Sequence, residues 1–299
     1  MTAFPQALTA AITQNGPTVV GVDPRPDLLP GSLREGLLGL SGRAYREAAA
    51  QAVSTWGKGV IEAVQGNACA VKIQVAFFEQ FGAPGWEALE AVCSAGREAE
   101  ILVIVDAKRG DIGSTAEAYA RSLLDEDGPL QADAVTLSPY LGRESLSPFL
   151  ERCKTQGKGL FLLLRTSNPG SDELQTETGA AQRIGSWIEG WNTSLVEGGY
   201  GPVGAVVGAT LPAGELGHWR SRLTHTPFLV PGYGAQGASA DDCRPCFDAQ
   251  GSGALVCSSR GVTFPGSEAG DQEAYDADFV AFIRQKAIRF RHEIAQILA

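Results

Sequence analysis

The sequence lacks any apolar run near the roughly 20 residues that a helix needs to cross a bilayer, so we expect no transmembrane segment. Its first residues, MTAFPQALTAAITQNG, have neither the basic start nor the sustained apolar stretch of a secretory signal, which favours a cytoplasmic protein. An excess of positive charge is also missing. The formal net charge of −10 argues against nucleic acid as a partner, although it allows a locally basic pocket for a small anion.

Histidine is scarce. His218, His225 and His292 lie in or near segments of helical pattern, which argues against a histidine-based triad or metal cluster. The six cysteines mostly lie within apolar patterns, as reduced structural thiols do. Cys243 and Cys246 form one CxxC with no partner motif to complete a zinc site, and a redox role for this pair is the alternative. We therefore expect no metal and no organic cofactor.

Eight short, β-rich apolar runs alternate with longer segments of helical period, such as 184–195 and 279–298. The runs are continuously apolar, which is typical of parallel strands that are covered by helices on both faces. No linker, charge block or short repeat divides the 299 residues. The pattern predicts an α/β protein with a single (β/α)8 TIM-barrel domain over residues 1–299. The eight runs are 18–24, 68–78, 101–109, 134–139, 159–166, 203–210, 227–232 and 254–261.

Polar residues occur within these runs or directly after them. In a barrel of this kind the functional groups gather at the carboxyl ends of the strands, so side chains from different runs should converge on one mouth. The candidates placed in this way are Asp23, Lys72, Asp106, Lys108, Ser167, Pro231, Gln236 and Arg260.

The stretch VIVDAKRGDIGST, residues 103–115, places three charged groups where an apolar run ends. Asp106 and Lys108 are two positions apart and share one face of an extended strand, and Asp111 follows in the loop. Nearby carboxylates keep a lysine protonated, and they repel an anion bound beside them. If a substrate carboxylate leaves as carbon dioxide, that repulsion is relieved while the lysine stabilises and protonates the carbanion. The alternative is a structural salt-bridge network at the barrel rim.

The helix after this stretch should begin near residue 114. Ser114 and Glu117 have the spacing of a capping box, which leaves Asp111 outside the helix.

Six motifs occur in this order along most of the chain: GVDPRP at 21–26, AVKIQVAFFEQFG at 70–82, DAKRGDIGST at 106–115, RTSNPG at 165–170, VPGYGAQG at 230–237 and SSRG at 258–261. Together they resemble the orotidine 5′-phosphate decarboxylases in their longer bacterial form. The resemblance implies a cofactor-independent enzyme that converts orotidine 5′-phosphate to UMP, the last step of de novo pyrimidine biosynthesis, and that forms a homodimer with shared active sites.

The same resemblance assigns roles to individual residues. Lys72, Asp106, Lys108 and Asp111 look like the alternating charged tetrad of the family, with Lys108 as the proton donor to C6 of the pyrimidine. Asp111 and Thr115 would reach into the site of the neighbouring subunit.

The expected substrate-binding residues are Asp23, Thr115, Ser167, Pro231, Gln236 and Arg260. By resemblance, Asp23 and Lys72 bind ribose hydroxyls with help from Thr115 of the partner chain, and Ser167 bonds the pyrimidine edge. Gln236 and Arg260 match the phosphate grip, and a guanidinium beside accessible backbone N–H groups independently suits a phosphate dianion.

Three other functions remain open at this point. A magnesium-dependent sugar-phosphate decarboxylase or aldolase on the same barrel needs an acidic ligand where this chain has Lys72. A Schiff-base aldolase needs a lysine with a lowered pKa, which flanking carboxylates oppose. A non-catalytic nucleotide sensor gives no reason for the three charges at 106–111. Two segments, 25–66 and 79–100, are insertions relative to the shorter branch of the family and have no role that the sequence reveals.

Overall fold

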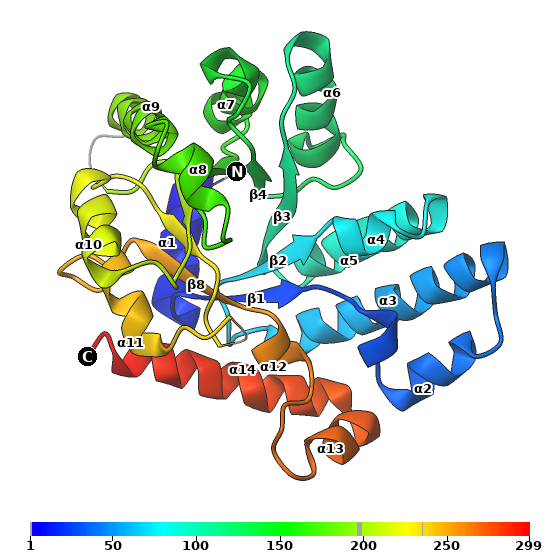
Figure 1. The fold of residues 1–299 in the computed structure, drawn as a ribbon. Helices are drawn as coiled ribbons and strands as arrows, with labels where there is room; N and C mark the ends of the chain where they lie inside the picture. Colours follow the sequence, from blue (N-terminus) through cyan, green and yellow to red (C-terminus); the bar gives the residue numbers. More distant parts are fainter. Residues whose placement is uncertain (1, 196–198, 235) are drawn as a thin grey trace.

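Eight parallel strands close into a barrel in the order β1 to β8 in the computed structural model, which describes residues 2–195, 199–234 and 236–299 (Figure 1). Each strand lies within one of the eight predicted runs, so the predicted (β/α)8 barrel is confirmed. The strands are β1 (Thr18–Val22), β2 (Ala70–Gln74), β3 (Leu102–Arg109), β4 (Ala134–Leu137), β5 (Gly159–Arg165), β6 (Val203–Val207), β7 (Phe228–Val230) and β8 (Ala254–Ser258).

Helices follow the strands and surround the barrel (Figure 1). The two segments of predicted helical period form α9 and α14. The helices are α1 (Phe4–Asn15), α2 (Gly31–Arg34), α3 (Gly42–Val64), α4 (Ala76–Glu79), α5 (Ala83–Glu98), α6 (Gly113–Leu124), α7 (Ser147–Thr155), α8 (Ser171–Gln175), α9 (Ala180–Leu195), α10 (Ala213–Arg222), α11 (Ala240–Cys243), α12 (Arg260–Thr263), α13 (Asp271–Ala277) and α14 (Phe279–Gln296). None of these helices, within the ranges just given, is both long and apolar enough to span a membrane.

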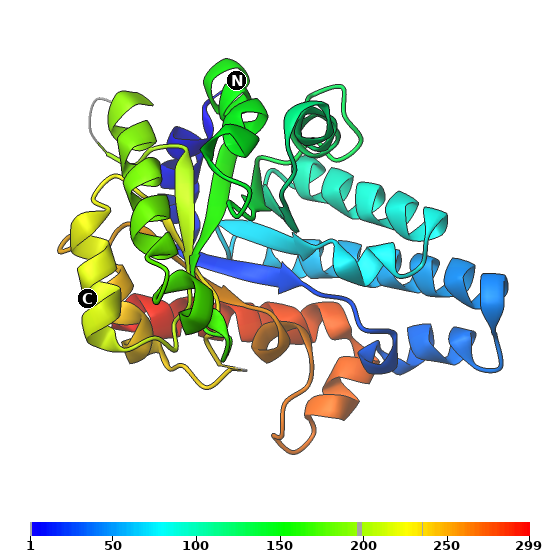
Figure 2. The same cartoon turned by 45° about the horizontal axis from the view of Figure 1, so that its top comes forward.

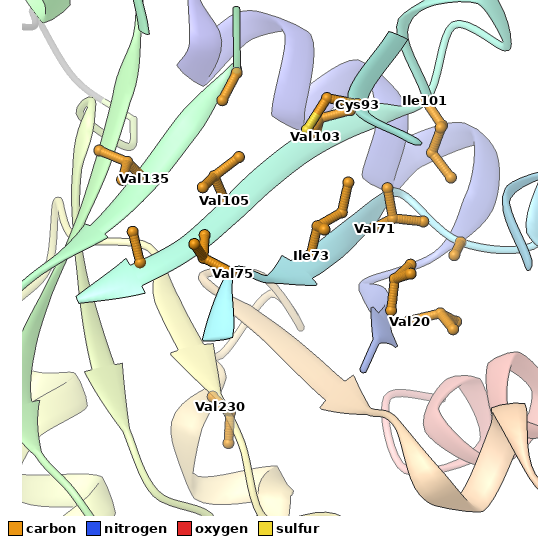
Figure 3. Packing of buried hydrophobic residues seen from close by; sticks show 14 of the residues in the cluster. Val20, Val71, Ile73, Val75, Cys93, Ile101, Val103, Val105, Val135 and Val230 are labelled. Atoms are coloured by element: carbon orange, nitrogen blue, oxygen red, sulfur yellow. The ribbon is translucent and has the colours of Figure 1, made fainter. Parts of the chain in front are cut away.

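The strands are apolar throughout because each one contributes to two cores. Alternate residues such as Val20, Val71, Val103 and Val105 belong to the large cluster between the strands and the outer helices (Figure 3). The residues between them point into the barrel and form a second, smaller cluster. Members of this inner cluster are Val19, Ala70, Ile104, Ala134, Phe161, Val206, Leu229, Leu255 and Cys257.

Helix α1 closes the amino end of the barrel. The backbone N–H of Phe4 donates to the carbonyl of Gly157, just before β5, at 2.7 Å. The Phe4 ring packs edge-to-face on Phe161 with ring centroids 6.0 Å apart and belongs to the inner cluster. Gly159 makes room for it, since a Cβ there would lie 2.3 Å from the Phe4 ring. Helix α1 therefore covers the inner core at this end of the barrel.

The segments 25–66 and 79–100 supply outer helices of the barrel, α3 and α5, for which the sequence alone gave no role. Figures 1 and 2 show α3 beside α5 and α14, and α3 packs on both of them. Trp56 of α3 donates its indole N–H to the hydroxyl of Tyr275 at 2.8 Å and stacks on Phe264. The first of these segments therefore ties the start of the barrel to the carboxyl-terminal helices.

Helix α6 begins at Gly113, one residue from the predicted start, but the predicted capping box is wrong. No side chain caps the helix. Both carboxylate oxygens of Glu117 instead accept hydrogen bonds from Arg152 of α7, at 2.6 and 2.7 Å. The buried guanidinium also binds Asp125, so a tertiary ion pair outcompetes the local cap.

We predict that Phe4→Ala destabilises the barrel by about 3–5 kcal/mol, the usual cost of removing a buried phenylalanine side chain. Phe4 is only 2 % exposed, so the variant would leave a cavity at the base of the inner core. The measurement is urea unfolding followed by circular dichroism. Gln6→Ala, on an exposed position of the same helix, is the matched control and should unfold like the wild type. Equal unfolding midpoints for the two variants would show that α1 is not part of the cooperative core.

Candidate active site

A cavity of about 810 Å³ opens at the carboxyl ends of the strands. Every predicted site residue except Asp111 and Thr115 lines it. Those that do are Asp23, Lys72, Asp106, Lys108, Ser167, Pro231, Gln236 and Arg260. The rule that strand-end polar groups converge on one mouth is thus confirmed by the position of the cavity.

The carboxylate of Asp106 is a buried part of the cavity lining, which we call the cavity floor together with its charged neighbours Asp23, Lys72 and Lys108. The side chain points into the barrel from β3, two positions beyond Ile104 of the inner cluster, and is 6 % exposed. One oxygen, Oδ2, accepts from Lys72 Nζ at 2.8 Å, and the other, Oδ1, accepts from Lys108 Nζ at 2.6 Å. Lys72 Nζ also lies 3.8 Å from Asp23 Oδ1. The floor is therefore a row of alternating charges that contains three members of the expected tetrad, Lys72, Asp106 and Lys108. Within one chain its fourth member is Asp23 rather than Asp111, which does not line the cavity.

The surrounding charges hold Asp106 and Lys72 in the ionised state. Burial alone would raise the pKa of Asp106, but the ammonium groups of Lys72 and Lys108 keep it well below its usual range. Burial would likewise lower the pKa of Lys72, yet Asp106 and Asp23 raise it above the ordinary lysine value. A neutral Asp106 is thus disfavoured at physiological pH.

Two further side chains, which the sequence analysis missed, complete the shell around Asp106. Gln74 donates to Oδ2 at 2.9 Å, and Thr136 donates to Oδ1 at 2.7 Å. Each oxygen of Asp106 therefore accepts one charged and one neutral donor. Strand periodicity carries a signal for both residues, since Gln74 is two positions after Lys72 and Thr136 is two positions after the inward-facing Ala134.

Lys108, the last residue but one of β3, has an unusual backbone conformation. Its φ is +47°, in the left-handed region that residues with a side chain rarely adopt. The pairing of β3 with β4 shifts register between Val105 and Arg109, so the strand bulges at this point. The Lys108 side chain is 44 % exposed, in contrast to the buried Lys72, and its ammonium group faces the cavity.

Asp23 offers an unused acceptor to the cavity. Its Oδ1 atom is buried and has no hydrogen-bond partner among the described residues. A buried carboxylate oxygen without a donor is costly unless a bound molecule or water supplies one. Asp23 is therefore well suited to accept a hydroxyl group of a ligand.

The opposite wall is formed by the loops after β5 and β7. Ser167 Oγ donates to Gln236 Oε1 at 3.3 Å, so the two loops meet across the cavity. Gln175 of α8 holds the first loop from behind: its Oε1 accepts from the Thr166 N–H at 2.9 Å, and its Nε2 donates to Thr166 Oγ1 at 2.7 Å. Thr166 and Gln175 also line the cavity and were missed by the sequence analysis. Thr166 ends the predicted run 159–166 and so carried a strand-end signal, whereas Gln175 lies on α8 and carried none.

Arg260 begins α12 at the rim of the cavity and is exposed. It makes no ion pair with any residue that the structure describes, so its guanidinium group is available to an anionic ligand. The neighbouring Ser259 packs against β1 where Gly21 has no side chain, since a Cβ there would lie 1.8 Å from Ser259 Oγ. The close approach of the β8 loop to β1 therefore requires glycine at position 21.

Asp111 and Thr115 lie outside the cavity of their own chain. The Asp111 carboxylate accepts from the backbone N–H of Ile112 at 2.8 Å, and Thr115 is exposed on the first turn of α6. One chain by itself thus brings together eight of the ten predicted residues and leaves these two on the surface.

Cys257 lines the cavity, whereas the other five cysteines and the three histidines are not among its lining residues. All six cysteines are buried and unpaired, and burial raises the pKa of Cys243 and of Cys246 to about 12, which argues against the redox alternative for this pair. Over residues 2–195, 199–234 and 236–299, no three His, Cys, Asp or Glu side chains gather as metal ligands would.

Comparisons with known proteins agree with this geometry. Residues 58–275 match the sequence profile of a family described as "Orotidine 5′-phosphate decarboxylase / HUMPS family". An orotidine 5′-phosphate decarboxylase of Rhodopirellula baltica is 44 % identical over 274 residues, which cover 88 % of this chain and 89 % of the relative. The enzyme of the same name from Deinococcus radiodurans is 40 % identical over 264 residues, covering 87 % and 89 % of the two chains.

Solved structures give the same result. The OMP decarboxylase of Leishmania donovani superposes with a TM-score of 0.75 at 33 % identity and covers 99 % of both chains. The UMP synthase of the same organism superposes with a TM-score of 0.77 at 35 % identity over all of this chain and 57 % of that longer one. The fold, the relatives and the charged cavity floor lead to one conclusion: the chain belongs to the orotidine 5′-phosphate decarboxylase family.

Proposed function

We propose that the protein decarboxylates orotidine 5′-phosphate to UMP without a metal or organic cofactor. The observation that carries the proposal is the ionised, buried carboxylate of Asp106, which lies between two ammonium groups on the floor of a nucleotide-sized cavity. Six buried, unpaired cysteines fit a reducing compartment, and we place the reaction in the cytoplasm.

The substrate would lie across the cavity, with its phosphate at the Arg260 side and its reacting carbon over the charged floor. A free guanidinium at the rim is suited to grip a phosphate dianion, with Gln236 on the neighbouring loop. Asp23 and Lys72 would meet the ribose hydroxyls, because the buried Asp23 Oδ1 belongs to the cavity lining and accepts no hydrogen bond from the residues that the structure describes. Ser167 would then face the pyrimidine edge from the opposite wall.

The chemical step follows from the charges on the floor. A substrate carboxylate placed beside Asp106 is repelled by it, and breaking the bond between C6 and the carboxylate releases neutral carbon dioxide. The bonding electron pair stays on C6, where the Lys108 ammonium group stabilises it. Lys108 then transfers a proton to C6, which gives UMP and a neutral amine that solvent reprotonates. Binding energy at the remote phosphate helps to hold the carboxylate in this repulsive position.

The two enzymatic alternatives fit the floor less well. A divalent cation bound between Asp23 and Asp106 would meet Lys72 Nζ, which already lies 2.8 Å from Asp106. A Schiff-base mechanism needs a neutral lysine, whereas Asp106 and Asp23 raise the pKa of Lys72. A non-catalytic nucleotide sensor would not need the buried row of alternating charges.

The experiment that tests the proposal is a decarboxylation assay on protein treated exhaustively with a chelator. Orotidine 5′-phosphate is added, and loss of its ultraviolet absorbance is followed together with release of carbon dioxide. We expect full activity without added metal, because the floor provides its own cations. Activity that returns only with magnesium would favour the metal-dependent alternative, and no activity under either condition would contradict the proposal.

Lys108→Ala should lower kcat by roughly 10³-fold or more, since it removes both the proton donor and the charge that stabilises the carbanion. UMP affinity and the thermal unfolding midpoint serve as checks that the fold and the cavity persist. Lys58→Ala, which removes an exposed lysine of α3, is the matched control and should keep wild-type activity. A folded Lys108→Ala protein with substantial turnover would show that Lys108 is not the proton donor.

We also propose that two chains form a dimer in which Asp111 and Thr115 complete the site of the partner subunit. Both residues lie on the surface beside large exposed apolar side chains: Ile112 is 55 % exposed and Tyr140 is 73 % exposed. The loop that carries Ile112 and the loop that carries Tyr140 are adjacent, because the backbone N–H of Ser138 donates to the Arg109 carbonyl at 2.8 Å. Such an apolar surface around two polar groups suits a twofold contact with a second copy.

Mixing two inactive variants tests the shared site. Lys108→Ala and Asp111→Ala should each be nearly inactive alone. In a hybrid dimer one site carries both defects and the other carries neither. With equal amounts and random pairing, half the dimers are hybrids, so activity should approach ~25 % of wild type. Exchange is verified with differently tagged chains that purify together; activity that stays at the level of the separate variants despite exchange would show that Asp111 acts within its own chain.

A further inference from the structure

Thr136 of β4 lies directly beside the charged residues of β3. The pairing of β3 with β4 is regular up to Val105 and resumes at Arg109, so residues 106–108 of β3 lie opposite Thr136 alone. Thr136 is 1 % exposed and lines the cavity. A single β4 side chain therefore faces both the central carboxylate and the proposed proton donor.

The Thr136 hydroxyl contacts both of these residues. It donates to Asp106 Oδ1 at 2.7 Å and accepts from the backbone N–H of Lys108 at 3.0 Å. The second bond fixes the backbone at the residue whose φ is +47°, a conformation that is unfavourable without such support. Gln74, the other neutral donor to Asp106, bonds the opposite oxygen.

We infer that Thr136 is a positioning residue for proton transfer. Its hydroxyl fixes the backbone of Lys108, and thereby the direction of the Lys108 side chain, and it holds Asp106 Oδ1 beside the Lys108 ammonium group. The inference rests on the proposed decarboxylation. When Lys108 gives its proton to C6, Asp106 Oδ1 loses its charged donor, and the Thr136 hydroxyl remains bonded to it. The carboxylate and the lysine thus keep their geometry through the step in which the charge of the lysine changes.

The test compares Thr136→Val, which keeps the shape and removes the hydroxyl, with Thr136→Ser, which keeps the hydroxyl. The matched control is Thr18→Val, because Thr18 is also fully buried on a barrel strand and donates its hydroxyl to a backbone carbonyl, but lies at the amino end of β1. For each protein kcat and KM for orotidine 5′-phosphate and the Kd of UMP are measured.

We expect Thr136→Val to lower kcat by roughly 10- to 100-fold, the effect of misplacing a reacting group by about 1 Å, while the Kd of UMP stays within about twofold of wild type. Thr136→Ser should recover most of kcat, and Thr18→Val should leave it unchanged. A residue that only stabilises the fold would change kcat and UMP affinity together. If Thr136→Val does not fold, Thr136→Ala carries the same expectation.

Two results would overturn the inference: a folded Thr136→Val protein with wild-type kcat, or equal losses of kcat in Thr136→Val and Thr136→Ser. The wild-type protein in the same assay separates this failure from that of the proposed function. An inactive wild type contradicts decarboxylation itself, whereas an active wild type with an equally active Thr136→Val variant contradicts only the role of Thr136.

Discussion

The site depends on keeping one carboxylate, that of Asp106, ionised inside the barrel. Burial disfavours its charge, so four donors must surround it: the ammonium groups of Lys72 and Lys108 and the neutral groups of Gln74 and Thr136. These donors come from β2, β3 and β4, three neighbouring strands of the closed sheet. The barrel is therefore what allows a charged floor in an otherwise apolar interior, because it fixes all four donors against one carboxylate.

The floor and the rim of the cavity are built from different kinds of structure, mainly strands for the floor and loops for the rim. Lys72 and Asp106 of the floor are buried on strands whose other face is packed against the outer helices, so they have little freedom to move. The rim residues Ser167 and Arg260 lie in or directly after loops, and their loops are held by specific contacts: Gln175 fixes Thr166, and Gly21 lets Ser259 approach β1. Reaction chemistry and substrate recognition thus come from different parts of the fold, which suits an enzyme that uses distant binding energy at its reacting carbon.

Much of this architecture was readable from the sequence by itself. Continuous apolar runs predicted all eight strands, because residues on both faces of a parallel strand are buried. The rule that functional groups follow the strands placed Asp23, Lys72, Asp106 and Arg260 at one mouth. These are local features. The period, the length of a run and the position of a polar residue at its end can all be read directly from the sequence.

Only the tertiary structure decided the contacts between strands. Thr136 lies 30 residues from Asp106, and its role depends on the register shift that sets it opposite residues 106–108. The capping box predicted at Ser114 does not form, because Arg152, 35 residues further on than Glu117, takes its carboxylate. Register, bulges and long-range ion pairs depend on which segments become neighbours in space, and that is determined by closure of the whole barrel rather than by any local stretch of sequence.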